Sequence, residues 1–113
     1  MSERIPKYLL MDMIGCIDNI HNYCLDYDFN RFDADSKTVD AVIRNIEVMG
    51  ESVKRLPEYF INDHPEIPWN FIIGTRNRLI HGYDSVDSKI LWDILKNNLP
   101  ELKIRLESLR DIL

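Results

Sequence analysis

The stretch that decides the fold is Pro68–Tyr83, which reads PWNFIIGTRNRLIHGY. Its apolar residues recur at intervals of three and four, which is the period of an α-helix. Pro68 or Trp69 begins this helix because proline suits a first turn, and Gly82 is a typical terminator. The stretch therefore predicts a helix with one apolar side. That side consists of Trp69, Ile72, Ile73, Leu79 and Ile80.

From Arg76 onwards the stretch brings a guanidinium, an amide, an imidazole and a phenol together within one or two helical turns. An arginine offers a planar fork for phosphate, and a histidine works as general acid or base near neutral pH. On a regular helix Arg76 and His81 diverge by about 140°, whereas Asn77 and His81 share a face. Arg76 and Tyr83 project onto the apolar side instead. We interpret the stretch as half of a site for phosphodiester chemistry, completed by a second copy of the chain.

Towards the N-terminus the sequence predicts two more helical regions joined by a short connection. The first runs from Ile5 to about Tyr27, and the polar run at 26–33 interrupts its pattern. The second spans about Ser36–Asp63, with Asp35 or Ser36 as its cap. Pro57 should kink this second helix or start a new segment.

Towards the C-terminus a last helical region follows, capped by Ser85 or Asp87. Its apolar stripe starts at Ile90 and continues beyond Pro100, which makes a kink or a fresh first turn. The connections are short, so neighbouring helices should pack antiparallel. The sequence predicts one all-α domain over residues 1–113, an antiparallel bundle of four to five helices.

Composition and charge limit the classes of function. The chain is 45% hydrophobic and 29% charged, as in soluble globular proteins. No apolar run approaches the roughly 20 residues of a membrane span, and the N-terminus lacks the features of a signal peptide, so we expect a cytoplasmic protein. The net charge of −5 disfavours a broad grip on nucleic acid. Any RNA contact should therefore be confined to a small positive locus and to exposed or single-stranded segments.

The two cysteines and the histidine between them give only a weak signal for a metal. Cys16 and Cys24 lie about 12 Å apart along one helix, which excludes a disulfide while the helix stands. His21 and Cys24 could begin a metal site, but two candidate ligands without a second pair are weak evidence. We expect buried structural cysteines, no metal site and no cofactor.

The polar side of the second helix allows two interpretations. Five charged residues fall within about 60° of one another on it. They are Asp40, Arg44, Glu47, Glu51 and Arg55. They form either a solvated face with Asp40–Arg44 and Glu51–Arg55 pairs at i,i+4, or a polar cleft lined by Arg44, Glu47 and Glu51. The cleft interpretation explains why two glutamates that otherwise repel stand one turn apart.

The pattern Arg76-Asn77-x-x-x-His81-x-Tyr83 resembles the signature of the HEPN domain family (higher eukaryotes and prokaryotes nucleotide-binding), and within it the HepT-like toxins. The similarity extends over most of the chain, through four flanking blocks. These blocks are Asp40–Glu51, His64–Trp69, Val86–Asp87 and Leu91–Asp93.

The resemblance implies a homodimeric helical bundle that acts as a metal-independent endoribonuclease. The 2′-hydroxyl of the RNA would attack its own phosphodiester and leave a 2′,3′-cyclic phosphate and a 5′-hydroxyl. His81 would be the general acid or base, Arg76 would hold the phosphate, and Asn77 would orient the imidazole or the phosphate. Arg78, Arg44 and Tyr83 are candidate contacts to RNA.

The resemblance also implies a partner. HepT-like toxins are usually encoded with a minimal nucleotidyltransferase antitoxin, which in the best-understood members attaches AMP to the motif tyrosine, here Tyr83. The chain would then be the toxin of a HepT/MntA-type toxin–antitoxin pair, silenced by AMPylation.

Other interpretations compete with this one. The chain could be a non-catalytic helical dimer that binds a nucleotidyltransferase or a nucleotide, or a helical scaffold without nucleotide chemistry. Residue by residue, Arg76 could pair with Glu47 or Glu51, His81 could sit favourably at a helix end, and Tyr83 could be a core or interface aromatic. The intact motif favours the enzyme, because a degenerate member would be expected to have lost a motif position.

Overall fold

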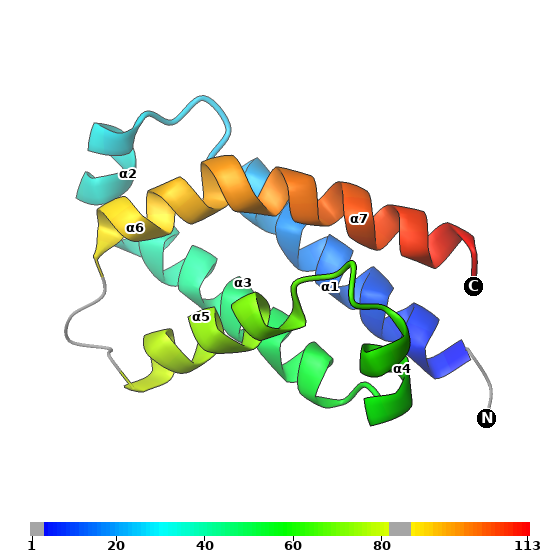
Figure 1. Ribbon diagram of the computed structural model, residues 1–113. Coiled ribbons are helices and arrows are strands. Elements are labelled where there is room, and N and C mark those ends of the chain that lie inside the picture. Colours follow the sequence, from blue (N-terminus) through cyan, green and yellow to red (C-terminus); the bar gives the residue numbers. More distant parts are fainter. Residues whose placement is uncertain (1–3, 82–86) are drawn as a thin grey trace.

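The computed structural model describes residues 4–81 and 87–113, and of residues 4, 80 and 81 it describes the backbone alone. Within these ranges, four long helices form the body of the protein, three short helices connect them, and a π-helical turn, η2, joins α6 to α7 (Figure 1). The elements are α1 (Arg4–Tyr23), α2 (Phe29–Ala34), α3 (Ser36–Lys54), α4 (Glu58–Asp63), α5 (Trp69–His81), α6 (Ser88–Asp93), η2 (Ile94–Asn98) and α7 (Leu99–Asp111).

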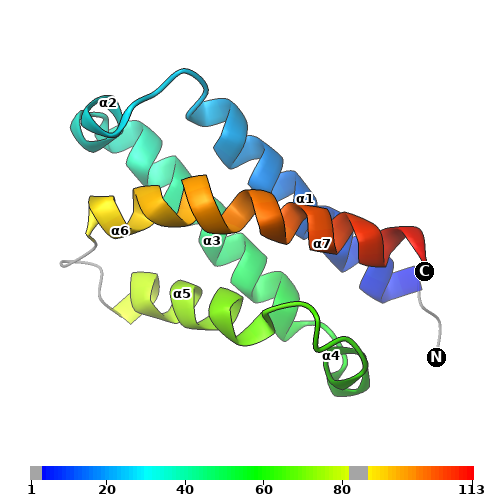
Figure 2. The ribbon, with the colours of Figure 1, turned by 45° about the horizontal axis from the view of Figure 1, so that its top comes forward.

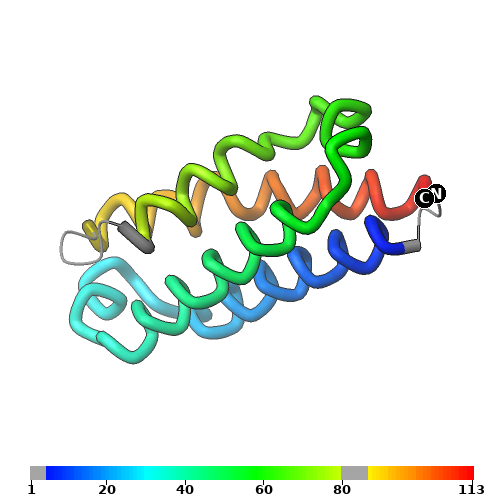
Figure 3. The backbone as a smooth tube through the Cα atoms, turned by 90° about the horizontal axis from the view of Figure 1, so that it is seen from below, coloured from blue at the N-terminus to red at the C-terminus, as the bar shows by residue number. Residues whose placement is uncertain are grey.

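Helix α3 is central to the bundle. It packs against α1 on one side and α5 on the other, and α1 also packs against α7 (Figure 2). Consecutive long helices run in opposite directions, so the start of α1 and the end of α7 lie at the same end of the molecule (Figure 3). The predicted all-α antiparallel bundle is confirmed for the described residues.

One continuous core holds the helices together. Its most buried side chains come from α1, α2, α3 and α7, and the amphipathic patterns of α1, α3 and α7 account for most of this burial. They include Leu10, Met13, Phe32, Val42 and Leu106, each with no exposed surface. From α5, Trp69, Ile72 and Leu79 are buried as predicted, and Ile73 is partly buried against the core.

The segment after α1 differs from the prediction. The first helix ends at Tyr23 rather than near Tyr27, and Asp26 takes a left-handed backbone with φ of 65°. The predicted connection contains helix α2, whose N-cap Asp28 accepts a hydrogen bond from the backbone of Arg31 at 2.8 Å. The sequence pattern missed this helix because it is only six residues long and buries a single side chain, Phe32.

Most other boundaries fall where the sequence places them. Asp35 caps α3 by accepting from the backbone N–H of Thr38 at 3.2 Å, and Pro57 separates α3 from α4. Helix α5 begins at Trp69, and Asp87 caps α6. The alternative cap Ser85 and the terminator Gly82 lie outside the described residues.

The last helical region continues through Pro100 without stopping. Pro100 stands in the first turn of α7, and the preceding turn is widened into η2 (Ile94–Asn98). Proline has no N–H to donate to the carbonyl four residues earlier, and a wider turn accommodates the missing bond. The prediction of a kink or a new first turn is met by this local widening.

Both cysteines are unpaired and buried, as predicted. Burial, aided by the negative charge of Asp12, raises the pKa of the Cys16 thiol to about 11. Burial also raises the pKa of Cys24. Both thiols are therefore neutral packing groups at physiological pH. Within residues 4–81 and 87–113, no helix is both long and apolar enough to cross a lipid bilayer.

Candidate active site

The side chain of Arg76 packs against helix α3 at Gly50. A Cβ atom added to Gly50 would lie 2.5 Å from both Cβ and Cγ of Arg76, much closer than real carbon atoms approach. The stem of Arg76 therefore occupies the space that a side chain at position 50 would need. This contact puts Arg76 on the α3-facing side of α5, the apolar side on which the helical projection placed it.

The guanidinium of Arg76 is held by two neighbours of different kinds. Its Nη2 donates to Oε1 of Glu51 on α3, and its Nη1 donates to Oδ1 of Asn77 at 3.0 Å. The arginine side chain is 16% exposed, whereas that of Glu51 is 53% exposed. Nε is buried and has no hydrogen-bond partner among the described residues. The guanidinium of Arg76 is therefore held in place, and some of its N–H donors are not used by the described residues.

The other motif residues are placed to different extents. Asn77 is partly buried and orients Arg76 within the same chain. Arg78 is exposed, and none of the described residues pairs with it. The backbone of α5 ends at His81, but the side chain of His81 and the whole of Tyr83 lie outside the described residues. Their geometry relative to Arg76 stays a prediction.

The charged residues of α3 pair differently from the i,i+4 pattern. Arg44 lies 4.0 Å from Glu47, and Glu51 pairs with Arg76. The described residues show neither the Asp40–Arg44 nor the Glu51–Arg55 pair. Of the two partners weighed for Arg76, the structure selects Glu51.

A groove of about 540 Å³ runs between α1 and α3. Arg44 and Glu51 contribute to its lining, but Glu47 does not. Glu51 therefore lines this groove and also pairs with the guanidinium of Arg76. The other lining residues are Met11, Asp12, Gly15, Cys16, Asn19, Val48, Ser52 and Arg55.

Gly50 is the site residue that the sequence patterns did not single out. A glycine inside a long helix is destabilising by about 1 kcal/mol relative to alanine, so it marks a place where something approaches closely. Gly50 stands beside the apolar stripe of α3, one residue before Glu51. That position could have been recognised as a contact point, but its partner could not be named from the sequence. Among the described side chains, no group of three or more His, Cys, Asp or Glu could hold a metal ion.

Comparison with known proteins places this chain in a family. The model of the family described as "Ribonuclease HepT-like" matches residues 13–109. The chain belongs to the HepT-like ribonuclease family. The matched region of this HepT-like chain includes both Gly50 and Arg76, so the arginine and the helix that carries it belong to the family region.

Two relatives match the HepT-like chain over nearly all of its length. A protein named as a putative RNase of Methanocaldococcus jannaschii is 39% identical over 113 residues, covering 99% of this chain and 93% of the relative. A protein named "Probable ribonuclease HepT" of Thermococcus cleftensis is 40% identical over 108 residues, covering 96% and 98%. No solved structure matches the chain.

Proposed function

We propose that this chain is a ribonuclease toxin that acts as a homodimer in the cytoplasm. It cuts RNA endonucleolytically and without a metal ion, by attack of the 2′-hydroxyl on the neighbouring phosphodiester. Arg76 holds the phosphate, and His81 moves the proton to or from the reacting oxygens. Asn77 keeps the guanidinium of Arg76 oriented. Family membership supports the ribonuclease activity.

The observation that carries this proposal is the way Arg76 is held. A guanidinium has more N–H donors than its contacts to Glu51 and Asn77 use, so it can also bind a phosphate. Because its stem is packed on Gly50, it loses little freedom when it does so. Arg78 on the same helix, which pairs with none of the described residues, supplies a second positive charge in a chain whose net charge is −5.

Two features support a homodimer. Arg76 is held towards α3, whereas the position of His81 on α5 diverges from it by about 140°, so one chain does not bring them together by helical geometry. The groove that Glu51 lines also includes Met11, and Met11 and Ile5 on α1 are exposed apolar side chains. A second copy seated there would cover these side chains.

Regulation by a partner is the second part of the proposal. A minimal nucleotidyltransferase antitoxin binds this chain and attaches AMP to Tyr83, which silences the toxin. The resemblance of the motif to the HepT branch supports this step. Intact-mass and peptide mass spectrometry of the chain co-expressed with its neighbouring nucleotidyltransferase should find one AMP on Tyr83. An unmodified Tyr83 in the silenced complex would rule out this form of control.

The nuclease is tested directly with purified protein and single-stranded RNA in EDTA. We expect fragments that end in 2′,3′-cyclic phosphate. Arg76→Ala and His81→Ala should each lower cleavage by about 10²- to 10⁴-fold, with the dimer intact by light scattering. Arg110→Ala is the matched control, because Arg110 pairs with Asp111 at the end of α7, far along the chain from the motif.

Three outcomes would contradict the proposal or a part of it. If the Arg76→Ala, His81→Ala double variant cleaves like the wild type, the assigned residues are not the site. If the wild type never cleaves but binds a nucleotidyltransferase tightly, the chain is the non-catalytic helical dimer instead. A monomer that cleaves at full rate would remove the second copy from the mechanism.

A further inference from the structure

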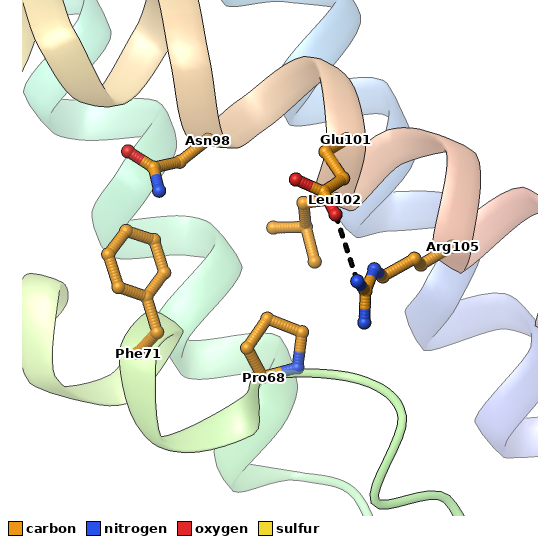
Figure 4. Close-up of a pocket in the computed structure, with 6 residues that line it drawn as sticks. All are labelled: Pro68, Phe71, Asn98, Glu101, Leu102 and Arg105. Atoms are coloured by element: carbon orange, nitrogen blue, oxygen red, sulfur yellow. Dashed lines mark hydrogen bonds and ion pairs between the residues drawn. The ribbon is translucent and has the colours of Figure 1, made fainter.

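A second concave site lies between the start of α5 and α7. It is a groove of about 270 Å³, close to the lower limit of small-ligand pockets, which span about 300–1,000 Å³. Figure 4 shows that side chains from both helices surround it. They are Pro68, Phe71, Asn98, Glu101, Leu102 and Arg105.

Phe71 gives this groove an open aromatic surface. The next residue, Ile72, is buried in the core, but 36% of the Phe71 surface remains exposed. Its ring borders the groove on the side opposite Arg105, and Pro68 lies between them (Figure 4). A half-exposed ring beside a proline is a flat apolar surface on which a planar ligand can stack.

The opposite wall is polar and partly fixed. Arg105 donates from Nη2 to Oε1 of Glu101 at 2.9 Å and from Nη1 to the carbonyl oxygen of Glu66 at 2.8 Å. These two bonds hold the guanidinium and the carboxylate at the edge of the groove. Oε2 of Glu101 has no partner among the described residues. It can therefore accept a hydrogen bond from a ligand.

Asn98 adds a second unused polar group. It stands at the junction of η2 and α7 but makes no capping hydrogen bond with its side chain. Its amide points towards the groove instead, above the ring of Phe71 (Figure 4). None of the described residues bonds to this amide, so its donor and acceptor are both available.

Phe71, Glu101 and Asn98 together indicate which class of ligand fits the groove. A free phosphate would be repelled by the carboxylate of Glu101, and an apolar peptide side chain would leave Asn98 and Glu101 unpaired. A nucleobase satisfies all three groups, because it has apolar faces for Phe71 and an edge of donors and acceptors for the polar wall.

The groove is also placed along the path of an RNA strand. Phe71 and Arg78 are seven residues apart on α5, so they lie on nearly the same face, two turns from each other. Arg78 is exposed and unpaired among the described residues. His81, at the end of α5, lies about 15 Å along the helix axis from Phe71. A strand along this face would meet a stacking surface, a cation and then the end of α5, where His81 stands.

We propose that the groove of Phe71, Asn98 and Glu101 binds one nucleobase of single-stranded RNA, a few nucleotides from the phosphodiester that is cut. This inference rests on the proposed ribonuclease function, whose substrate it helps to hold. Phe71 stacks on the base, Asn98 and Glu101 bind its edge, and Arg78 contacts a phosphate between the groove and the motif.

The test uses full-length protein and a short single-stranded oligonucleotide of 2′-O-methyl RNA, which has no 2′-hydroxyl to attack. One 2-aminopurine is placed at each position in turn, because its fluorescence falls when it stacks. We expect quenching at one position on binding to the wild type. Phe71→Ala should remove the quenching and weaken binding by about tenfold, and Phe71→Trp should retain both.

Two further variants control for misfolding and for the loss of an exposed aromatic ring elsewhere on the surface. Phe71→Leu keeps an apolar side chain of similar size without the ring, and it should also lose the quenching while its circular dichroism spectrum stays unchanged. Tyr23→Ala removes another exposed aromatic ring, at the end of α1, and should behave like the wild type. Quenching that persists in both Phe71→Ala and Phe71→Leu would overturn the proposal.

The binding test and the cleavage test fail independently. If the oligonucleotide binds with quenching but natural RNA is not cut, the ribonuclease function is wrong and the base site stands. If RNA is cut in EDTA but no position of the oligonucleotide is quenched, the base site is wrong and the nuclease stands. Unchanged affinity in Phe71→Ala would also overturn the base site.

Discussion

The two ends of α3 each hold a carboxylate, and the two are held in different ways. Near the start, Asp35 accepts from the hydroxyl groups of Tyr27 at 2.6 Å and Thr38 at 2.7 Å. Near the end, Glu51 accepts from Arg76, which comes 25 residues later in the chain. The first set of contacts is local in sequence, and the second joins two separate helices.

This difference separates a structural carboxylate from a site carboxylate. The hydrogen bonds of Tyr27 and Thr38 lower the pKa of Asp35 to about 2, so its charge is committed to the cap. Glu51 is half-exposed and, among the described residues, has only Arg76 as a cationic partner, which in the proposed mechanism also contacts a phosphate. Local contacts fix a helix end, whereas the long-range contact holds the side chain that we propose binds the phosphate.

The largest effect is expected at Gly50, where α5 crosses α3. Gly50→Ala places a methyl group against Cβ and Cγ of Arg76, and Cβ cannot move away without moving α5. Overpacking of this kind costs about 1–3 kcal/mol, more than the roughly 1 kcal/mol gained from helix propensity. We expect a lower free energy of unfolding in urea and a loss of cleavage.

Gly15→Ala is the matched control for this substitution. Gly15 also lies inside a long helix, but nothing stands within 4 Å of an added Cβ. This variant should therefore be more stable than the wild type by about 0.5–1 kcal/mol. If Gly50→Ala is stabilised to the same extent, the close crossing of α3 and α5 is not a feature of the protein in solution.

A smaller effect, mainly on activity, is expected at Glu51. Glu51→Gln removes the charge that holds Nη2 of Arg76 but leaves Asn77 on Nη1. Stability should change by less than about 1 kcal/mol, because the carboxylate is half-exposed and screened. We expect kcat to fall by about tenfold, less than in Arg76→Ala, because the guanidinium keeps one of its two anchors.

Glu47→Gln distinguishes positioning from a general change of charge. Glu47 lies one turn from Glu51 and contacts Arg44 rather than Arg76, so its variant should keep the wild-type kcat. Equal losses in the two variants would mean that net charge, not the Arg76 contact, governs activity. A loss in Glu51→Gln as complete as in Arg76→Ala would give Glu51 a direct part in the chemistry.

The contrast between local and long-range contacts also explains what the sequence could predict. Helix starts at Asp35, Trp69 and Asp87 follow from caps and prolines within a few residues, and the structure confirms them. Helix α2 was not predicted because its main stabilising contact is distant in sequence. The ring of Phe32 packs against the ring of Trp92, with 5.1 Å between their centroids. A six-residue helix has too few positions to show a period.

The candidate site, too, was predictable only where local sequence patterns determine it. The helical projection placed Arg76 on the apolar side of its helix, and the structure finds it packed on Gly50. Glu51 was one of two predicted partners of Arg76, because the spacing along α3 does not show which glutamate faces α5. The groove at Phe71 was not predicted, since its walls come from α5 and α7 and no local pattern links them.

The smallest effect concerns the pH dependence of the local carboxylate. The pKa of Asp35 is lowered from its usual 3.8 to about 2. Its charged form therefore contributes stability that is complete above about pH 4 and is lost as the pH falls towards 2. Asp35→Asn keeps an acceptor for the backbone N–H of Thr38, because asparagine caps as well as aspartate, but it lacks the charge.

Urea unfolding midpoints of the wild type and Asp35→Asn should therefore differ at pH 6 and converge as the pH approaches 2. Tyr27→Phe removes the first of the hydrogen bonds that lower this pKa, so its difference from the wild type should shrink over the same range. A gap between the wild type and Asp35→Asn that stays constant from pH 6 to pH 2 would mean that the charge of Asp35 does not support the start of α3. The contrast with Glu51 would then be one of burial and distance alone.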